Sequence, residues 1–117
     1  MNILIVDDDK GVVRMLADFL RSKGHKATCA YSGSQGLEYA VHQTCDLIFL
    51  DFDMPDITGL EFTDAIRRRR LPMKIFIISG YPVDISPLAQ LRKVDGYLQK
   101  PFKFKEIEAI LAQCENQ

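Results

Sequence analysis

The feature that most constrains the fold is an alternation of short apolar runs with longer amphipathic stretches. Residues 3–6 and 47–50 are apolar at every position, which is typical of strands that are buried on both faces of a parallel sheet. Aspartates end both runs, at Asp7 and Asp51. Three further strands are expected, at residues 26–29, 74–79 and 97–99.

Helices are expected between these strands. Residues 13–20 carry apolar side chains at helical spacing, with Gly24 as the C-cap, and Ser32 is the expected N-cap of a second helix. Apolar stripes at residues 60–66 and 107–111 indicate a third helix and a last one. Because strands and helices alternate about five times, we expect a parallel sheet with helices on both faces.

Length, charge and cysteine content narrow the class of protein. The 117 residues fit one domain, and the net charge of −1 gives no basic excess of the kind that nucleic-acid binding requires. The three cysteines have no metal-ligand or disulfide-framework spacing. The apolar run before Asp7 is too short for a signal peptide or a membrane span. We therefore expect a single cytoplasmic domain, residues 1–117, that binds neither nucleic acid nor membrane.

Reactive side chains follow the expected strands at their carboxyl ends: Asp7, Asp8, Asp51, Ser79 and Lys100. These ends meet at one edge of a parallel sheet, where ligands bind near the point at which strand order reverses. Carboxylates brought together repel one another, and a hard divalent cation such as Mg²⁺ relieves the repulsion. Lys100 and Ser79 could then hold a phosphoryl group while Asp51 attacks it in line.

Four segments together resemble the response-regulator receiver family. They are residues 3–8 (ILIVDD), 46–56 with 58–59 (DLIFLDFDMPD and TG), 77–81 (IISGY) and 96–102 (GYLQKPF). The resemblance covers nearly the whole chain. It implies a flavodoxin-like (βα)5 three-layer sandwich, with a five-stranded parallel sheet of order 2-1-3-4-5.

The resemblance also implies roles for the acids. Asp51 would be the phosphoacceptor, and it would share a Mg²⁺ ion with the other acids. Asp8 would bind the ion directly and Asp7 mainly through water, while the backbone carbonyl of Asp53 would be a further ligand.

For the remaining motif residues, the resemblance implies a switch. Ser79 would be the hydroxyl that moves toward the phosphoryl group, and Tyr97 the aromatic side chain that then turns inward. Lys100 would pair with Asp51 or with its phosphoryl group, and Pro101 would follow a cis peptide bond.

The function implied is that of a phosphoacceptor switch in a two-component system or phosphorelay. A histidine kinase or a histidine phosphotransfer protein would supply the phosphoryl group. The face made by the fourth helix, fifth strand and fifth helix would then change and control a partner or effector domain. Only self-phosphorylation and autodephosphorylation are expected, so the chain is not predicted to be an enzyme.

The chain departs from the family pattern in three places. Between Ser79 and Lys100 it is about one residue shorter than the usual family spacing. With Ser86 as N-cap, Pro87 can occupy the first helical position, which leaves only residues 87 to about 93 and predicts a short or irregular fourth helix. Asp53 and Tyr81 occupy two positions at which the family tunes the lifetime of the phosphoryl group. The arginines at 67–70 are interpreted as the solvated end of a helix, with a docking role as the alternative.

Two other classes of function stay open at this point. The strand-end pair Asp51 and Asp53 resembles the nucleophile motif of haloacid-dehalogenase-type phosphatases, although those carry it on the first strand. A binding module with a degenerate site is the third hypothesis, and the intact acids, hydroxyl and lysine argue against it. No Rossmann fingerprint or P-loop occurs in the sequence.

Overall fold

The computed structural model describes residues 1–82, 84, 86–87 and 93–115 of the chain. Five strands form one parallel sheet in the order β2-β1-β3-β4-β5. Their bounds are Asn2–Val6 (β1), Lys26–Ala30 (β2), Leu47–Asp51 (β3), Lys74–Ser79 (β4) and Gly96–Gln99 (β5). The expected strand order is confirmed, and each expected strand is present within one residue at either end.

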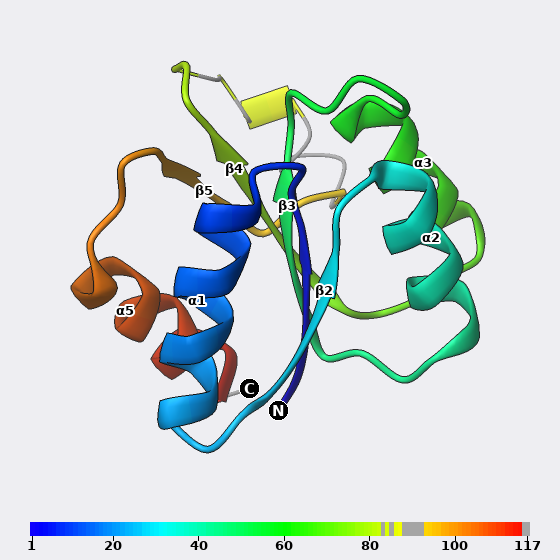
Figure 1. Ribbon diagram of the computed structural model, residues 1–117. Coiled ribbons are helices and arrows are strands. Elements are labelled where there is room, and N and C mark those ends of the chain that lie inside the picture. The colour runs from blue at the N-terminus through cyan, green and yellow to red at the C-terminus, as the bar shows by residue number, and fades with distance from the viewer. Residues whose placement is uncertain (83, 85, 88–92, 116–117) are drawn as a thin grey trace.

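Within the part of the chain that the structure describes, four helices with complete bounds connect or follow these strands (Figure 1). They are Lys10–Ser22 (α1), Gly33–His42 (α2), Gly59–Arg68 (α3) and Phe104–Glu115 (α5). The short fourth helix expected from residue 87 onward falls mostly outside the described residues.

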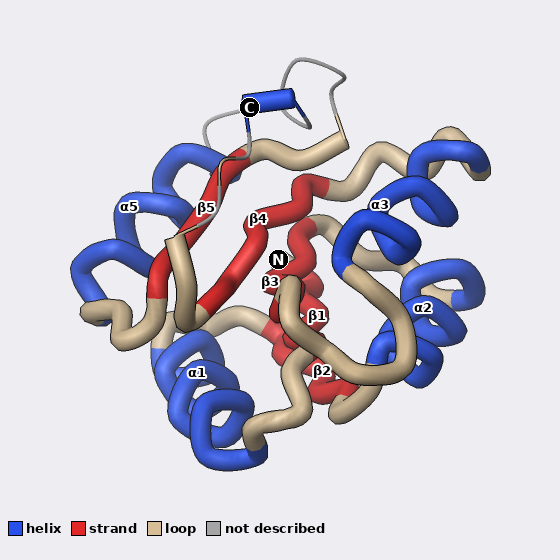
Figure 2. The backbone as a smooth tube through the Cα atoms, turned by 90° about the horizontal axis from the view of Figure 1, so that it is seen from above, coloured by secondary structure: helices blue, strands red, loops and turns tan. Residues whose placement is uncertain are grey.

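The helices make two layers, one on each face of the sheet (Figure 2). Helices α1 and α5 pack on one face against side chains that include Ile3, Ile5 and Phe49. Helices α2 and α3 pack on the other face against alternate residues of the same strands, among them Leu4 and Ile48. Both faces of the central strands are therefore buried, which explains why these strands are apolar at every position.

Local signals fix the ends of the helices. Asp9 caps α1 by accepting hydrogen bonds from the backbone N–H groups of Gly11 and Val12, and Ser32 caps α2. Gly24 adopts a φ of 88° just after α1, which a glycine does without strain. Among the described residues, no helix has the length and apolar character that crossing a membrane requires.

The expected third helix is confirmed, but two of its side chains differ from expectation. Leu60 belongs to the apolar stripe, yet its side chain is exposed, whereas Phe62 and Ile66 of the same stripe are buried. The sequence predicts that Arg67 belongs to the solvated end of the helix. Its guanidinium instead folds back onto the chain and donates to the carbonyls of Leu71, Met73 and Lys93.

Candidate functional site

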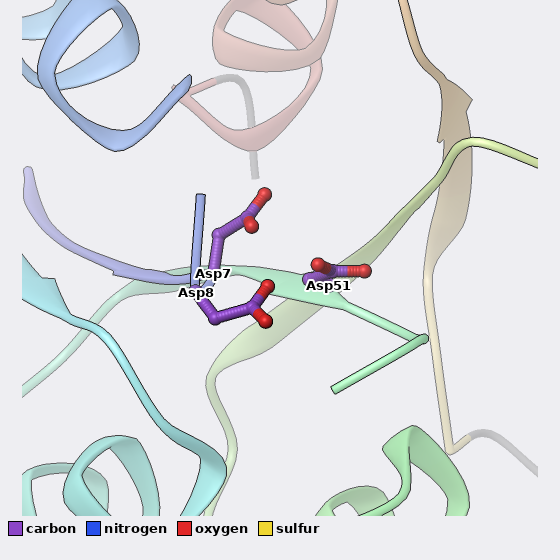
Figure 3. A group of neighbouring side chains, drawn as sticks. All are labelled: Asp7, Asp8 and Asp51. Atoms are coloured by element: carbon purple, nitrogen blue, oxygen red, sulfur yellow. The ribbon is translucent and has the colours of Figure 1, made fainter. Parts of the chain in front are cut away.

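Three acids meet at the carboxyl ends of β1 and β3, the point at which strand order reverses. The register pairs Val6 of β1 with Leu50 of β3, so Asp7, which directly follows β1, lies beside Asp51, the last residue of β3. Asp8 joins them from the β1–α1 loop (Figure 3). Ligand oxygens of Asp7, Asp8 and Asp51 all lie within 4.8 Å of one another. The convergence expected from the sequence is therefore confirmed.

Lys100 supplies a positive charge beside these acids. It directly follows β5, and its backbone N–H donates to the carbonyl of Ser79 at 2.8 Å. Its ammonium Nζ lies 2.8 Å from Oδ2 of Asp7 and 3.5 Å from Oδ2 of Asp51. Burial alone would lower the pKa of this ammonium, but Asp7 and Asp51 outweigh burial and raise the pKa. Lys100 is therefore charged at any physiological pH.

The environment of Asp51 disfavours its charge. Burial raises the pKa of the Asp51 carboxyl to about 6, and the neighbouring carboxylate of Asp7 adds to this increase. The N–H of Asp53, which donates to Oδ1 of Asp51 at 3.0 Å, and the ammonium of Lys100 act in the opposite direction. A carboxylate in such a setting gains from any further positive charge placed beside it.

The donor set of this cluster fits a hard divalent cation. Asp7 is fully buried; its Oδ1 accepts from the N–H of Asp9, while its Oδ2 accepts no hydrogen bond from the described residues. The Lys100 ammonium is close to this oxygen but is not aligned as a hydrogen-bond donor. An unsatisfied buried carboxylate oxygen is costly, and oxygen-only clusters of this kind are suited to Mg²⁺.

Ser79 and Tyr97 are joined through the loop that follows β4. The fully buried Ser79 hydroxyl donates to Oδ2 of Asp53 at 2.6 Å and accepts from the N–H of Tyr81 at 3.1 Å. The carbonyl of Tyr81 in turn accepts from the hydroxyl of Tyr97 at 2.8 Å. A continuous set of hydrogen bonds thus leads from the acidic site to the outer strand β5.

The structure brings together most of the residues that the sequence singled out. Asp7, Asp8, Asp51 and Lys100 form one cluster, with Ser79 at the end of the adjacent strand β4. The Lys100–Pro101 peptide bond is cis, as expected.

Sequence reasoning gives Asp53 a backbone carbonyl that binds the metal ion and a side chain at a position that tunes the lifetime of the phosphoryl group, but it misses the contact of this side chain with Ser79. Its carboxylate accepts the Ser79 hydroxyl. The acid at this position was visible in the sequence, but nothing in the sequence indicated which side chain it would meet.

Comparison with known proteins gives the class that this fold and site define. The family model described as "Response regulator receiver domain" matches residues 3–112. The chain belongs to this family, whose members are phosphoacceptor domains of two-component signalling and act with histidine kinases or phosphotransfer proteins. The phosphatase and degenerate-module hypotheses are not supported by this assignment.

Among individual proteins, the chain is similar to the response regulator ArlR of Staphylococcus saprophyticus, with 35% identity over 108 residues. These residues are 92% of this chain and 49% of ArlR. It is also similar to the CAI-1 autoinducer sensor kinase/phosphatase CqsS of Vibrio cholerae, with 34% identity over 85% of this chain and 15% of CqsS. The chain thus spans half or less of the length of these two relatives.

A solved structure with the same fold is the response regulator TrrA of Thermotoga maritima, in complex with Mg²⁺ and a beryllium fluoride. It is 28% identical to this chain, with a TM-score of 0.84 and 97% of each chain covered. A two-component response regulator from Clostridium difficile gives a TM-score of 0.87 at 27% identity, covering 100% of this chain and 97% of its own.

Proposed function

We propose that this chain is a single receiver domain that accepts a phosphoryl group on Asp51. The observation that carries the proposal is the convergence of Asp7, Asp8 and Asp51 within 4.8 Å, with the Lys100 ammonium among them. A phosphohistidine of a histidine kinase or of a phosphotransfer protein is the expected donor.

The metal site that we propose consists of Asp7, Asp8 and Asp51, with the backbone carbonyl of Asp53 as a further ligand. A bound Mg²⁺ ion would neutralise these carboxylates and the charge of the transferring phosphoryl group. The unsatisfied Oδ2 of Asp7 and the raised pKa of Asp51 support this proposal, because both are relieved by a cation.

The chain's own residues divide the transfer between them. An oxygen of the ionised Asp51 carboxylate attacks phosphorus as the bond to the donor nitrogen breaks, and the product is an aspartyl phosphate. Lys100 lies within reach of Asp51 and can move from Asp7 to a phosphoryl oxygen. The attack needs no proton transfer from Asp51, because the carboxylate is the nucleophile.

The added charge would act as the switch. It attracts the Ser79 hydroxyl and the Lys100 ammonium, and the movement of Ser79 alters the loop to which Tyr97 is bonded. We propose that Tyr97 then turns inward and that the face around β5 and α5 changes toward a partner or effector domain. The chain is similar both to a response regulator and to a sensor kinase. We therefore leave the identity of the effector domain out of the proposal.

We further propose that the chain acts in the cytoplasm and turns over no external substrate. The three cysteines are free thiols in the structure, which agrees with a reducing compartment.

The test is intact mass after incubation with acetyl phosphate and Mg²⁺. One added phosphoryl group per chain is expected for the wild type and for Asp18→Asn, an exposed carboxylate of α1, and none for Asp51→Asn. Steady release of phosphate from an added phosphomonoester by an unmodified chain would contradict the proposal in favour of a phosphatase.

A further inference from the structure

The hydrogen bond from Ser79 to Asp53 uses the same hydroxyl proton that a phosphoryl group on Asp51 would need. A serine hydroxyl has one proton, and in this structure that proton is donated to Oδ2 of Asp53 at 2.6 Å. The same hydroxyl cannot also donate to a phosphoryl oxygen on Asp51. Engagement of a phosphoryl group therefore requires that the bond to Asp53 is broken first.

We propose that the Asp53 carboxylate is a positioning residue that holds the Ser79 hydroxyl in the unphosphorylated state and competes with the phosphoryl group for its proton. This inference rests on the proposed function of Asp51. Ser79 and Lys100 favour the phosphorylated state of the switch, and the inference adds Asp53 as a residue that opposes it.

The geometry of the hydrogen bond between Ser79 and Asp53 is that of a strong one. A hydroxyl donating to an ionised carboxylate over 2.6 Å is a short, charge-assisted hydrogen bond. Ser79 is fully buried, so its hydroxyl gains nothing from water when the bond breaks, whereas the exposed Asp53 carboxylate does. The Tyr81 N–H donates to the same oxygen at 3.1 Å, so the Ser79 hydroxyl accepts from one partner while it donates to the other.

Asp53 is also tied to the acceptor that it opposes. Its backbone N–H donates to Oδ1 of Asp51, while its side chain accepts from Ser79. One residue therefore contacts both the phosphorylation site and the switch hydroxyl. A phosphoryl group on Asp51 would repel the Asp53 carboxylate and so weaken the bond that holds Ser79.

The two states are then separated by an exchange of acceptors. Before phosphorylation, Ser79 donates to Asp53 and the Tyr81 carbonyl holds the Tyr97 hydroxyl. After phosphorylation, Ser79 donates to the phosphoryl group. Removing the first acceptor lowers the cost of reaching the second state and raises the apparent affinity for a phosphoryl mimic.

The experiment is a double-mutant cycle at Asp53 and Ser79. The affinity for beryllofluoride at saturating Mg²⁺ is measured by titration calorimetry for each variant. With Ser79 present, Asp53→Ala is expected to tighten binding on the order of tenfold, since hydrogen bonds to charged groups have this strength. Asp53→Asn, which keeps a neutral acceptor, is expected to give a smaller gain.

In the Ser79→Ala background, Asp53→Ala is expected to give a smaller gain in affinity for beryllofluoride. This remaining gain comes from the removal of one negative charge alone. Equal gains in both backgrounds would overturn the inference, because Asp53 would then act by charge alone. Wild-type protein that binds no beryllofluoride would overturn the proposed function together with the inference.

A second readout needs no phosphoryl mimic. In metal-free protein, the amide resonance of Tyr81 is expected to shift in Asp53→Ala, because this N–H donates to the oxygen that Asp53 positions. An unchanged Tyr81 amide in a folded Asp53→Ala variant would overturn the inference and leave the phosphoacceptor role of Asp51 standing.

Discussion

The ammonium of Lys100 lies closer to Asp7 than to the proposed phosphoacceptor: Nζ is 2.8 Å from Oδ2 of Asp7 and 3.5 Å from Oδ2 of Asp51. Asp7 is fully buried, whereas Lys100 keeps about a fifth of its side chain, 22%, exposed to solvent. In the absence of a cation, Lys100 is therefore the counter-charge of a buried acid. Once a phosphoryl group is present, the same side chain is free to change partner.

This relationship predicts how Lys100→Ala affects stability. Removing one partner of a buried ion pair leaves an uncompensated charge, which costs about 3 kcal/mol. We expect a loss of this size in Mg²⁺-free urea denaturation, and a clearly smaller loss when Mg²⁺ is added, because a cation can replace the ammonium beside Asp7. Lys105→Ala, at an exposed position in α5, is the matched control. Equal losses with and without Mg²⁺ would contradict this interpretation of the site.

A second prediction concerns Asp8, the exposed member of the acidic cluster. Because Asp8 is not buried, Asp8→Asn should leave the fold intact while it removes one charged ligand oxygen. We expect Mg²⁺ affinity to fall roughly tenfold or more, since even outer-shell groups of metal sites contribute that much. Calorimetric titration with MgCl₂ measures the effect, with Asp18→Asn as the control for loss of a surface charge. Unchanged affinity would place the cation elsewhere.

The core of the fold and the acidic cluster could be predicted from the sequence because both depend on the order of residues along strands. Runs such as residues 3–6 and 47–50 are apolar at every position, and a parallel sheet covered by helices on both faces buries every position of its central strands. The same topology brings the strand ends together, so Asp7, Asp51 and Lys100 converge without any further information.

Contacts that depend on side-chain reach could not be predicted in this way. Asp53 follows β3 and Ser79 ends β4, and their hydrogen bond depends on rotamers rather than on periodicity. Asp56 likewise caps a helix from a distant loop. Arg67 looks like a member of a charge run because sequence alone does not show which carbonyls are left without partners.

The Asp56 contact predicts a dependence of stability on pH. Its carboxylate accepts from the N–H groups of Gly33 and Ser34 and from the Ser34 hydroxyl at the start of α2. The hydrogen bonds of Ser34, followed by that of Gly33, lower the pKa of Asp56 to about 2. A lowered pKa means that the stabilisation is complete above the ordinary pKa of about 3.9 and is lost as the pH falls toward 2.

We therefore expect wild type to exceed Asp56→Asn in urea midpoint at pH 6, with the difference shrinking between about pH 4 and the acid limit of folding. Asp18→Asn, an exposed acid of α1, should show no such convergence with wild type. A wild-type advantage that grows on acidification would have the wrong sign for a carboxylate with a lowered pKa.

The last prediction separates two neighbouring arginines. Arg67 donates from Nε to the carbonyl of Lys93 and from one terminal nitrogen to the carbonyls of Leu71 and Met73, at distances between 2.9 and 3.1 Å. Its guanidinium also lies 3.5 Å from Asp95. One side chain thus ties the end of α3 to the segments that precede β4 and β5.

Truncation at this position should leave several carbonyls without a partner, at about 1 to 3 kcal/mol for each one that stays buried. We expect Arg67→Ala to lose on the order of 3 kcal/mol in urea denaturation, and Arg67→Lys to recover only part of it, because an ammonium lacks the planar fork of donors. Arg68→Ala, one residue along and exposed, should change stability by no more than about 0.5 kcal/mol. Equal losses of stability in Arg67→Ala and Arg68→Ala would instead support the interpretation of residues 67–70 as a solvated helix end.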